Sequence, residues 1–269
     1  MPLRSRSHAL SALLFSSFIV AAGCNGQHGP LLAHVSDEWT RTYTLQDDGE
    51  FQIVGSDGSI DVQGSDGSSI EVKAERIAHA ASESAARGIP ERIRIEEDVA
   101  PDKVVLRVEG LEGVVIGVNT EVNFHVSVPR GTKLRLHGAN GDVSVSNVNG
   151  HVVASAANGG VTGKGLGGGV EMRATNGNVK VDLAGVGSDP IELRSTNGTI
   201  ALALPTTADA NVDATVRNGS IEVKDLPLEL TGEQDKRRIR GRLNAGGAPV
   251  QLTTTNGNIT ITGVAPAAP

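Results

Sequence analysis

The feature that most constrains the fold of this chain is a twelve-residue pattern that occurs seven times. The copy at residues 170–181 reads Val-Glu-Met-Arg-Ala-Thr-Asn-Gly-Asn-Val-Lys-Val, and the other copies align with it without a gap. They occupy residues 51–62, 134–145, 152–163, 191–202, 212–223 and 250–261. Apolar residues alternate with polar ones on both sides of the central dipeptide. This alternation indicates a strand, a turn and a second strand.

The central dipeptide predicts how each turn is built. It is Asp57-Gly58 in the first copy and Asn-Gly in the others. The Asn-Gly pairs are Asn140-Gly141, Asn158-Gly159, Asn176-Gly177, Asn197-Gly198, Asn218-Gly219 and Asn256-Gly257. Glycine tolerates positive φ, asparagine can also adopt it, and stacked asparagines can hydrogen bond in a ladder. We therefore expect these pairs to form structural corners, with positive φ at Gly177 and Gly198.

The spacing of the corners separates two possible folds. Asn-Gly is also the strongest local signal for a hairpin, so an antiparallel meander is the alternative. The corners at 140, 158, 176, 197 and 218 are 18, 18, 21 and 21 residues apart, with further turn signals between them. Such spacing lets like residues stack in successive coils. We predict an all-β fold, a single-stranded parallel β-solenoid of about 18–21 residues per coil, with one short helix.

Two segments interrupt the pattern. The first contains the Ala- and Glu-rich residues 78–87, where we expect a short helix that ends at Gly88 and Pro90. Strands are predicted to follow around residues 92–95, 104–108 and 121–128. The second segment is residues 225–249. Because unpaired strand edges at the ends of a solenoid invite pairing with other chains, the short helix and the second segment are expected to act as caps.

The N-terminus is typical of a bacterial lipoprotein signal. Arg4 and Arg6 precede an apolar run at residues 9–22, and small residues lead to Cys24, the chain's single cysteine. The run is shorter than the ~20 residues that span a bilayer. We expect residues 1–23 to be cleaved and Cys24 to carry lipid that anchors the protein to a membrane.

This leader also predicts the domain organisation and the location of the protein. We expect residues 24–38 to be a lipidated N-terminus and flexible tether, residues 39–263 the solenoid, and residues 264–269 a disordered tail. The predicted location is extracytoplasmic. Asn25 follows the cysteine where an aspartate can retain lipoproteins in the inner membrane, which favours the outer membrane.

Charge and composition exclude several classes of protein. Removing residues 1–23 leaves 22 basic against 31 acidic residues, a net charge of −9, so nucleic acid is not an expected partner. A lone cysteine allows neither an intrachain disulfide nor a CxxC zinc site. With one Trp, one Tyr and four Phe, a cleft lined by aromatic rings is not expected.

The repeat accounts for the motifs that resemble chemical sites. Gly163-x-Gly165-x-x-Gly168 matches the dinucleotide fingerprint in letters, but it lies between two repeat strands and opens no helix. Asp57 and Asp66 are nine residues apart, as in calcium-binding solenoids, yet turn chemistry explains both. No catalytic motif or metal-ligand spacing is present, and we predict neither a cofactor nor a metal.

One row of carboxylates raises the question of an enzyme. Glu171, Glu192 and Asp213 would stack in adjacent coils, and glycosidases need two carboxylates at a fixed separation. Arg173 and Arg194 lie two residues from the first two on the same face, which indicates charge pairing instead. We predict that the protein is not an enzyme, with a polysaccharide-active enzyme as the less favoured alternative.

A dense basic cluster allows two interpretations. It consists of Lys236, Arg237, Arg238, Arg240 and Arg242. It is either a solvated strand, in which charges alternate with the inward Ile239 and Leu243, or a binding site for an anionic ligand such as lipopolysaccharide phosphates or an acidic glycan.

Several of these segments together are similar to one family. The run from Trp39 to Val62, Val128-Pro129, the repeated Thr-Asn-Gly units, Leu204-Pro205 and the closing segment to Ile261 resemble the bacterial putative-adhesin domain. The resemblance implies a β-solenoid in a secreted or membrane-attached protein, without established catalytic residues. Together with the N-terminal leader, it predicts a lipid-anchored envelope protein with a non-enzymatic adhesion-like or scaffold role, with an envelope ligand-binding protein as the alternative.

Overall fold

The computed structural model describes residues 33–46, 48–111, 117–231 and 235–265. Cys24, the predicted signal peptide, the tether up to residue 32 and residues 266–269 of the predicted tail lie outside the described residues. All the described residues belong to one compact unit, which begins at residue 32.

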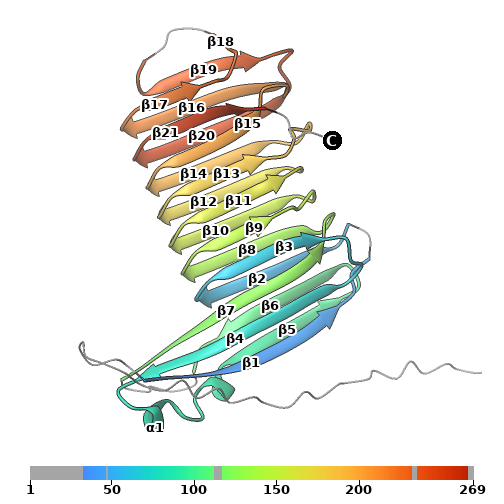
Figure 1. Ribbon diagram of the computed structural model, residues 1–269, viewed down its shortest axis with the longest axis vertical. Coiled ribbons are helices and arrows are strands. Elements are labelled where there is room, and N and C mark those ends of the chain that lie inside the picture. The colour runs from blue at the N-terminus through green and yellow to red at the C-terminus, as the bar shows by residue number, and fades with distance from the viewer. Residues whose placement is uncertain (1–32, 47, 112–116, 232–234, 266–269) are drawn as a thin grey trace, which may run out of the picture. The chain divides into compact units, whose positions relative to one another are not determined.

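The described residues form two β-sheets (Figure 1). In spatial order, the first sheet contains β1 (Ala33–Tyr43), β4 (Ile70–Ala80), β7 (Val118–Pro129), β3 (Ile60–Ser65), β9 (Val143–Ser146), β11 (Val161–Leu166), β13 (Val179–Leu183), β15 (Ile200–Pro205), β21 (Ile259–Val264) and β17 (Ile221–Lys224). The second contains β18 (Leu228–Leu230), β19 (Arg238–Leu243), β16 (Ala210–Asn218), β20 (Ala248–Asn256), β14 (Ile191–Asn197), β12 (Val170–Asn176), β10 (Val152–Asn158), β8 (Lys133–Asn140), β2 (Glu50–Asp57), β6 (Lys103–Glu109) and β5 (Arg94–Ala100). Helix α1 (Glu83–Ala86) and a 3-10 helix (Pro90–Arg92) lie between β4 and β5.

Each copy of the pattern forms one coil, with one strand in each sheet. Val152 is in parallel register with Leu134 on one side and Val170 on the other, and Val170 pairs with Ile191. This confirms the predicted parallel β-solenoid, and the antiparallel meander is wrong for the repeats. Inward side chains from the two sheets form the core. The tenth residue of the pattern is at most 1% exposed in all coils except the terminal one, where Ile221 is half-buried.

The predicted ladder of corner side chains is present. Asn158 Nδ2 donates to Asn140 Oδ1 at 2.9 Å, and Asn176 donates to Asn158 at the same distance. The series runs without a break from Asp57 through Asn197 and Asn256 to Asn218. In parallel with it, the N–H of each corner glycine except Gly219, which lies in the terminal coil, donates to the carbonyl of the next corner residue in the stack, as Gly159 does to Asn176 at 3.1 Å.

The prediction that Gly177 and Gly198 have positive φ is wrong. Positive φ occurs at Gly141, Gly159, Gly219 and Gly257, but neither at Gly177 and Gly198 nor at the asparagines of the ladder. Glycine is needed at Gly177 for another reason. A Cβ atom there would lie 1.9 Å from the carbonyl oxygen of Gly159, and the same distance separates a Cβ at Gly198 from Gly177 O. The close stacking of coils, rather than φ, excludes a side chain.

The order of the last coils differs from their order in the sequence. The coil of β20 and β21 lies between the coil of β14 and β15 and that of β16 and β17 (Figure 1). Gln251 therefore separates Glu192 from Asp213, which were expected to be adjacent. β19 pairs with the outer edge of β16. The strand β20 of the final coil therefore pairs with the inner edge of β16.

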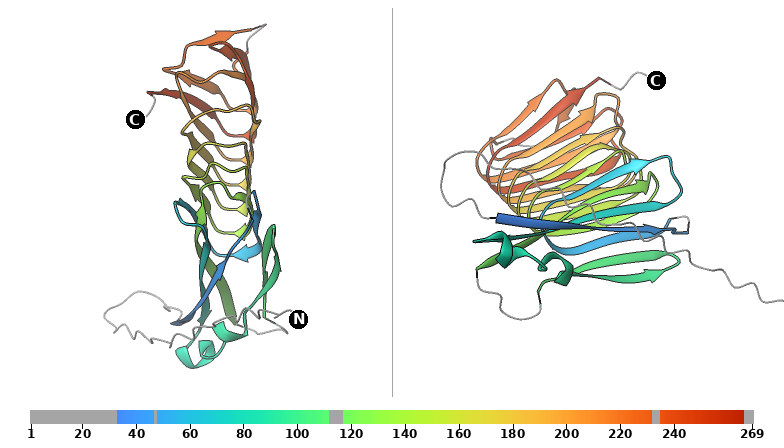
Figure 2. Two further views of the ribbon diagram at one scale, coloured as in Figure 1. Left: turned by 90° about the vertical axis from the view of Figure 1, so that its right-hand side faces the viewer. Right: turned by 60° about the horizontal axis from the view of Figure 1, so that its bottom comes forward.

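Both interrupting segments extend the sheets. β1, β4 and β7 continue the first sheet with antiparallel pairs, while β6 and β5 continue the second (Figure 2). The predicted helix at 78–87 shrinks to α1, because β4 pairs with β1 up to Ala80. For the same reason residues 33–38 are strand and not tether. β18 and β19 cover the edge of β16, which confirms the cap predicted for residues 225–249.

Within the described ranges, none of the helices has the length and apolarity needed to cross a membrane.

Gly177→Ala tests the stacking of the corners. The added methyl group meets a backbone oxygen that cannot move aside, so we expect the free energy of unfolding to fall by about 2 kcal/mol or more. Gly185→Ala is the matched control, since nothing lies within 4 Å of a Cβ placed there and its φ is not positive. It should change stability by less than about 0.5 kcal/mol. Equal denaturation midpoints for the two variants would contradict the assignment.

Candidate functional site

The outer faces of the two sheets carry rows of polar side chains in register. Along one row of the first sheet, Lys73 of β4 lies beside His125 of β7, which lies beside Asp61 of β3. Ser144, Thr162 and Lys180 of β9, β11 and β13 continue the row. These side chains share a face because residues of a strand point alternately inward and outward.

A shallow groove of about 430 Å3 crosses this face where β1, β4, β7 and β3 meet. Carbon atoms make up most of its exposed surface, but most of its lining residues carry polar groups, namely Thr40, Arg41, Thr42, Asp61, Gln63, Glu71, Lys73, His125 and Ser127. Asp61 accepts a hydrogen bond of 2.8 Å from Ser144 Oγ, and its other oxygen is 3.9 Å from His125 Nδ1. The groove therefore offers hydroxyl, amide, imidazole, carboxylate and cationic groups, which suit a ligand rich in hydroxyl groups.

Sequence reasoning missed this groove. Asp61 and His125 are far apart in the chain, and neither belongs to a motif that indicates a chemical site. The alternation of residues 121–128 does indicate that His125 faces outward. That β7 lies beside β3 is a result of tertiary pairing, and no local signal in the sequence shows it.

The carboxylates of the second sheet's outer face are paired with arginine, as the sequence predicted. Arg173 lies 2.9 Å from both Glu171 and Glu192, and Arg194 also pairs with Glu192. Burial raises the pKa of Glu192, but hydrogen bonds from Arg173 and Arg194 outweigh it and hold the pKa below its ordinary value. A general acid needs a raised pKa, so Glu192 is not prepared for that role.

Three of the five side chains in the basic cluster pair with carboxylates of the described residues. Arg238 and Arg240 lie 3.0 and 2.9 Å from Asp213, and Arg242 lies 2.7 Å from Glu229. Within the described part of the chain, the side chains of Lys236 and Arg237 have no carboxylate partner. The strand alternates as predicted, with Leu243 buried and Ile239 half-buried. The solvated-strand interpretation thus accounts for the three paired arginines.

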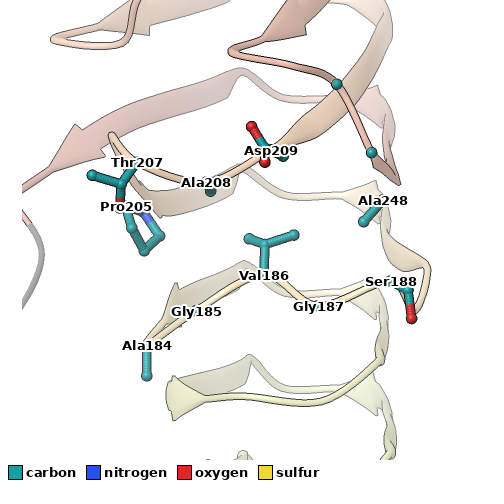
Figure 3. A pocket seen from close by; sticks show the side chains of 12 residues that line it. Ala184, Gly185, Val186, Gly187, Ser188, Pro205, Thr207, Ala208, Asp209 and Ala248 are labelled. Carbon is teal, nitrogen blue, oxygen red and sulfur yellow. The ribbon is translucent and has the colours of Figure 1, made fainter.

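A second hollow, of about 750 Å3, lies where three connections between strands meet (Figure 3). Residues 184–188 and 205–209 form two of its sides, and residues 246–248 the third. Val186 points into the space between them. Asp209 is its only titratable residue among those described, and its carboxylate accepts a hydrogen bond from the Ala245 N–H.

The two aspartates with calcium-repeat spacing do not share a site. Asp57 accepts a hydrogen bond of 2.7 Å from Asn140 at the start of the ladder, and Asp66 pairs with Arg130 at 2.7 Å. Over the described ranges, no group of three or more His, Cys, Asp or Glu side chains could hold a metal ion.

The fold and its surfaces define a class of protein: a two-sheet solenoid with stacked corners and open polar faces. The chain matches the family model Toastrack DUF4097 over residues 49–262, and it belongs to that family. This agrees with the predicted likeness to a putative-adhesin domain. No relative is found among curated proteins.

The solved structures that match this chain are distant in sequence. A putative cell adhesion protein from Clostridium sporogenes is 11% identical, with a TM-score of 0.48 over 86% of this chain and 100% of that one. A putative adhesin from Bacteroides fragilis is 12% identical, with a TM-score of 0.32 over 85% and 97%. A putative lipid binding protein from Parabacteroides distasonis is 11% identical, with a TM-score of 0.30 over the same shares.

Asp213→Asn tests the pairing at the basic cluster. Burial raises the pKa of Asp213, but hydrogen bonds from Arg238 and Arg240 outweigh it and lower the pKa below its ordinary 3.8. The unfolded chain therefore binds the proton first as pH falls. The stabilisation that the ionised Asp213 carboxylate gives the folded state is complete above about pH 5, and it is lost as pH drops through the folded-state pKa of Asp213.

Chemical denaturation of wild type and variant measures this contribution. Near neutral pH we expect the variant to be less stable by about 1 kcal/mol, since the carboxylate is partly exposed and screened. The difference should shrink near pH 3. Asp182→Asn is the control, because Asp182 also faces outward and has no ion pair within the described part of the chain. A pH-independent difference for Asp213→Asn would show that charge pairing is not its cause.

Proposed function

We propose that this protein is a lipid-anchored envelope protein with a non-enzymatic, adhesion-like or scaffold role outside the cytoplasm. The observation that carries the proposal is the regular outer surface, on which polar side chains stand in register from β4 to β13. Neighbouring positions repeat at the strand spacing of about 4.8 Å. Such a surface offers many similar hydrogen-bonding positions along its length, which suits an extended polymer or another surface better than a small substrate.

The state of the carboxylates favours binding over catalysis. Glu192 and Asp213 are each hydrogen bonded to two arginines, which lowers the pKa of both. Hydrolysis of a glycosidic bond needs one carboxyl group that stays protonated near neutral pH. A polysaccharide-active enzyme is therefore the less supported alternative.

The anchor is proposed at Cys24, with the outer membrane as its location. The basic residues, apolar run and small residues that precede the cysteine support it. Mass spectrometry of the mature protein should find residues 1–23 removed and lipid on Cys24. An unmodified N-terminus at another position would contradict the anchor.

A second candidate function is binding of an anionic glycan or lipopolysaccharide at the basic cluster. Lys236 and Arg237 favour it, because neither has a carboxylate partner within the described ranges. Arg238 and Arg240 lie next to them on β19 and remain about half exposed while they pair with Asp213. Four cationic side chains within five residues could attract a polyanion, although Asp213 offsets part of this charge.

Retention on purified envelope material tests both candidates. The chain from residue 25 onward should bind this material without releasing soluble fragments from it. Release of fragments that stops when Asp61 is replaced with Asn would instead indicate an enzyme that works in the groove.

Charge variants then locate the binding. If an anionic ligand binds at the cluster, Lys236→Gln with Arg237→Gln should weaken retention strongly at low salt, and added salt should weaken it for wild type. Arg107→Gln with Lys133→Gln is the matched control, because it also replaces one arginine and one lysine, both exposed on strands of the second sheet that lie far from β19 and outside the polar row of the first sheet. Equal retention of the two double variants would contradict the second candidate and leave the groove face as the binding surface.

A further inference from the structure

The last coil of the chain, residues 248–264, is inserted between two coils made by earlier residues (Figure 1). We call these residues the C-terminal coil. In the second sheet, Val250 pairs with Ile191 on one side and with Val212 on the other. In the first sheet, Ile259 pairs with Ile200 and with Ile221. Without the C-terminal coil, both sheets would have a gap one strand wide with an open parallel edge on each side.

This gap, which we call the slot, recognises the C-terminal coil by the contacts that stack all the coils. Asn256 donates to Asn197 and accepts from Asn218, both at 2.8 Å. Gly198 N–H donates to Asn256 O at 2.9 Å, and Gly257 N–H donates to Asn218 O at 3.0 Å. The inward side chains Leu252, Ile259 and Ile261 are fully buried. None of these contacts depends on the segment that joins the C-terminal coil to the rest of its own chain.

That joining segment, residues 244–247, is short and bent. Leu243 at the end of β19 and Ala248 at the start of β20 both pair with Ala210 of β16, so the segment crosses over one strand. It spans two strand spacings, about 9.6 Å. Asn244 and Gly246 have φ of 52° and 74°. A left-handed conformation is costly for asparagine, though less so than for most residues, and a short bent link of this kind favours exchange between copies.

Five hydrogen bonds among the described residues hold the link in its bent form. The backbone N–H groups of Ala245 and Gly246 donate to Asp209 Oδ1 and Leu243 O, and Gly247 O accepts from Asn211 Nδ2, each at 3.0 Å. Asn244 Nδ2 donates to the carbonyl oxygens of Thr206 and Ala208 at 3.0 and 2.7 Å. On its other side the link borders the 750 Å3 hollow, which Gly246, Gly247 and Ala248 help to line (Figure 3). A link that leads away from the molecule would therefore lose these five hydrogen bonds, whose polar groups water can satisfy instead, and little apolar packing.

We infer that the slot accepts the C-terminal coil of a second copy of this chain, so that the protein forms strand-exchanged dimers. Because the exchanged segment is identical, all the ladder, backbone and core contacts of the slot are formed again between the two copies. Only the link changes its path. This interaction is independent of the ligand and of the proposed function.

Cysteine pairs across the slot test the exchange in the full chain with Cys24 replaced by Ser. Ala201 of β15 and Thr260 of β21 are register partners, face outward and have no side-chain hydrogen bond to lose within the described residues. Register partners in a parallel pair lie about 4.8 Å apart, within the range of a disulfide. One variant carries Ala201→Cys and the other Thr260→Cys. The two are unfolded together, refolded at high concentration and oxidised.

A disulfide between the two variants requires the C-terminal coil of one copy to occupy the slot of the other. Random mixing predicts that about half of the exchanged dimers contain both variants and become cross-linked. The double variant Ala201→Cys/Thr260→Cys shows that the geometry allows the disulfide. Thr162→Cys mixed with Lys180→Cys is the matched control, since these register partners belong to coils that are consecutive in the chain. Cross-linking no greater than in this control, while the double variant oxidises, would overturn the inference.

Discussion

The contact on which the rest of the structure depends is the stacking of one Asn-Gly corner on the next. At each step a glycine N–H reaches the carbonyl of the neighbouring corner, and the asparagine side chains hydrogen bond along the same direction. The coils approach so closely there that a Cβ on Gly177 would overlap a backbone oxygen. This repeated contact sets the register of both sheets, because each corner joins the end of a strand in the second sheet to the start of a strand in the first.

The surface follows from this register. Because the strands of successive coils are in register, their outward residues line up in rows. These rows determine which charged side chains lie next to one another. Glu192 lies beside Arg173 of the preceding coil, and Asp213 lies beside Arg238 and Arg240 of the cap. The groove at Asp61 and His125 forms where β7, which belongs to no repeat, joins the first sheet next to β3. The regular part of the solenoid thus supplies polar rows, and its irregular end supplies a hollow with mixed chemistry.

The local pattern was sufficient to predict the coils, their corners and the inward residues, because each copy carries the same alternation and the same dipeptide. It could not predict the order of the last coils. Asn218 and Asn256 fit equally well beside Asn197, and the choice is made by β19, which covers one edge of β16. The reason that Gly177 must be glycine could not be predicted either, because it depends on how closely the neighbouring coil approaches in the folded structure. The groove was missed for the same reason, because His125 meets Asp61 only through strand pairing.

Hydrogen exchange of the corner glycine amides tests the stacking and its order most directly. In the structure Gly257 N–H donates to Asn218 O, whereas Gly219, in the terminal coil, has no such acceptor among the described residues. The amide of Gly257 should therefore exchange at least about a hundred times more slowly than that of Gly219. If the coils stacked in the order of the sequence, Gly219 would be protected and Gly257 would be the exposed end. Protection of Gly219 with rapid exchange at Gly257 would contradict the inserted C-terminal coil.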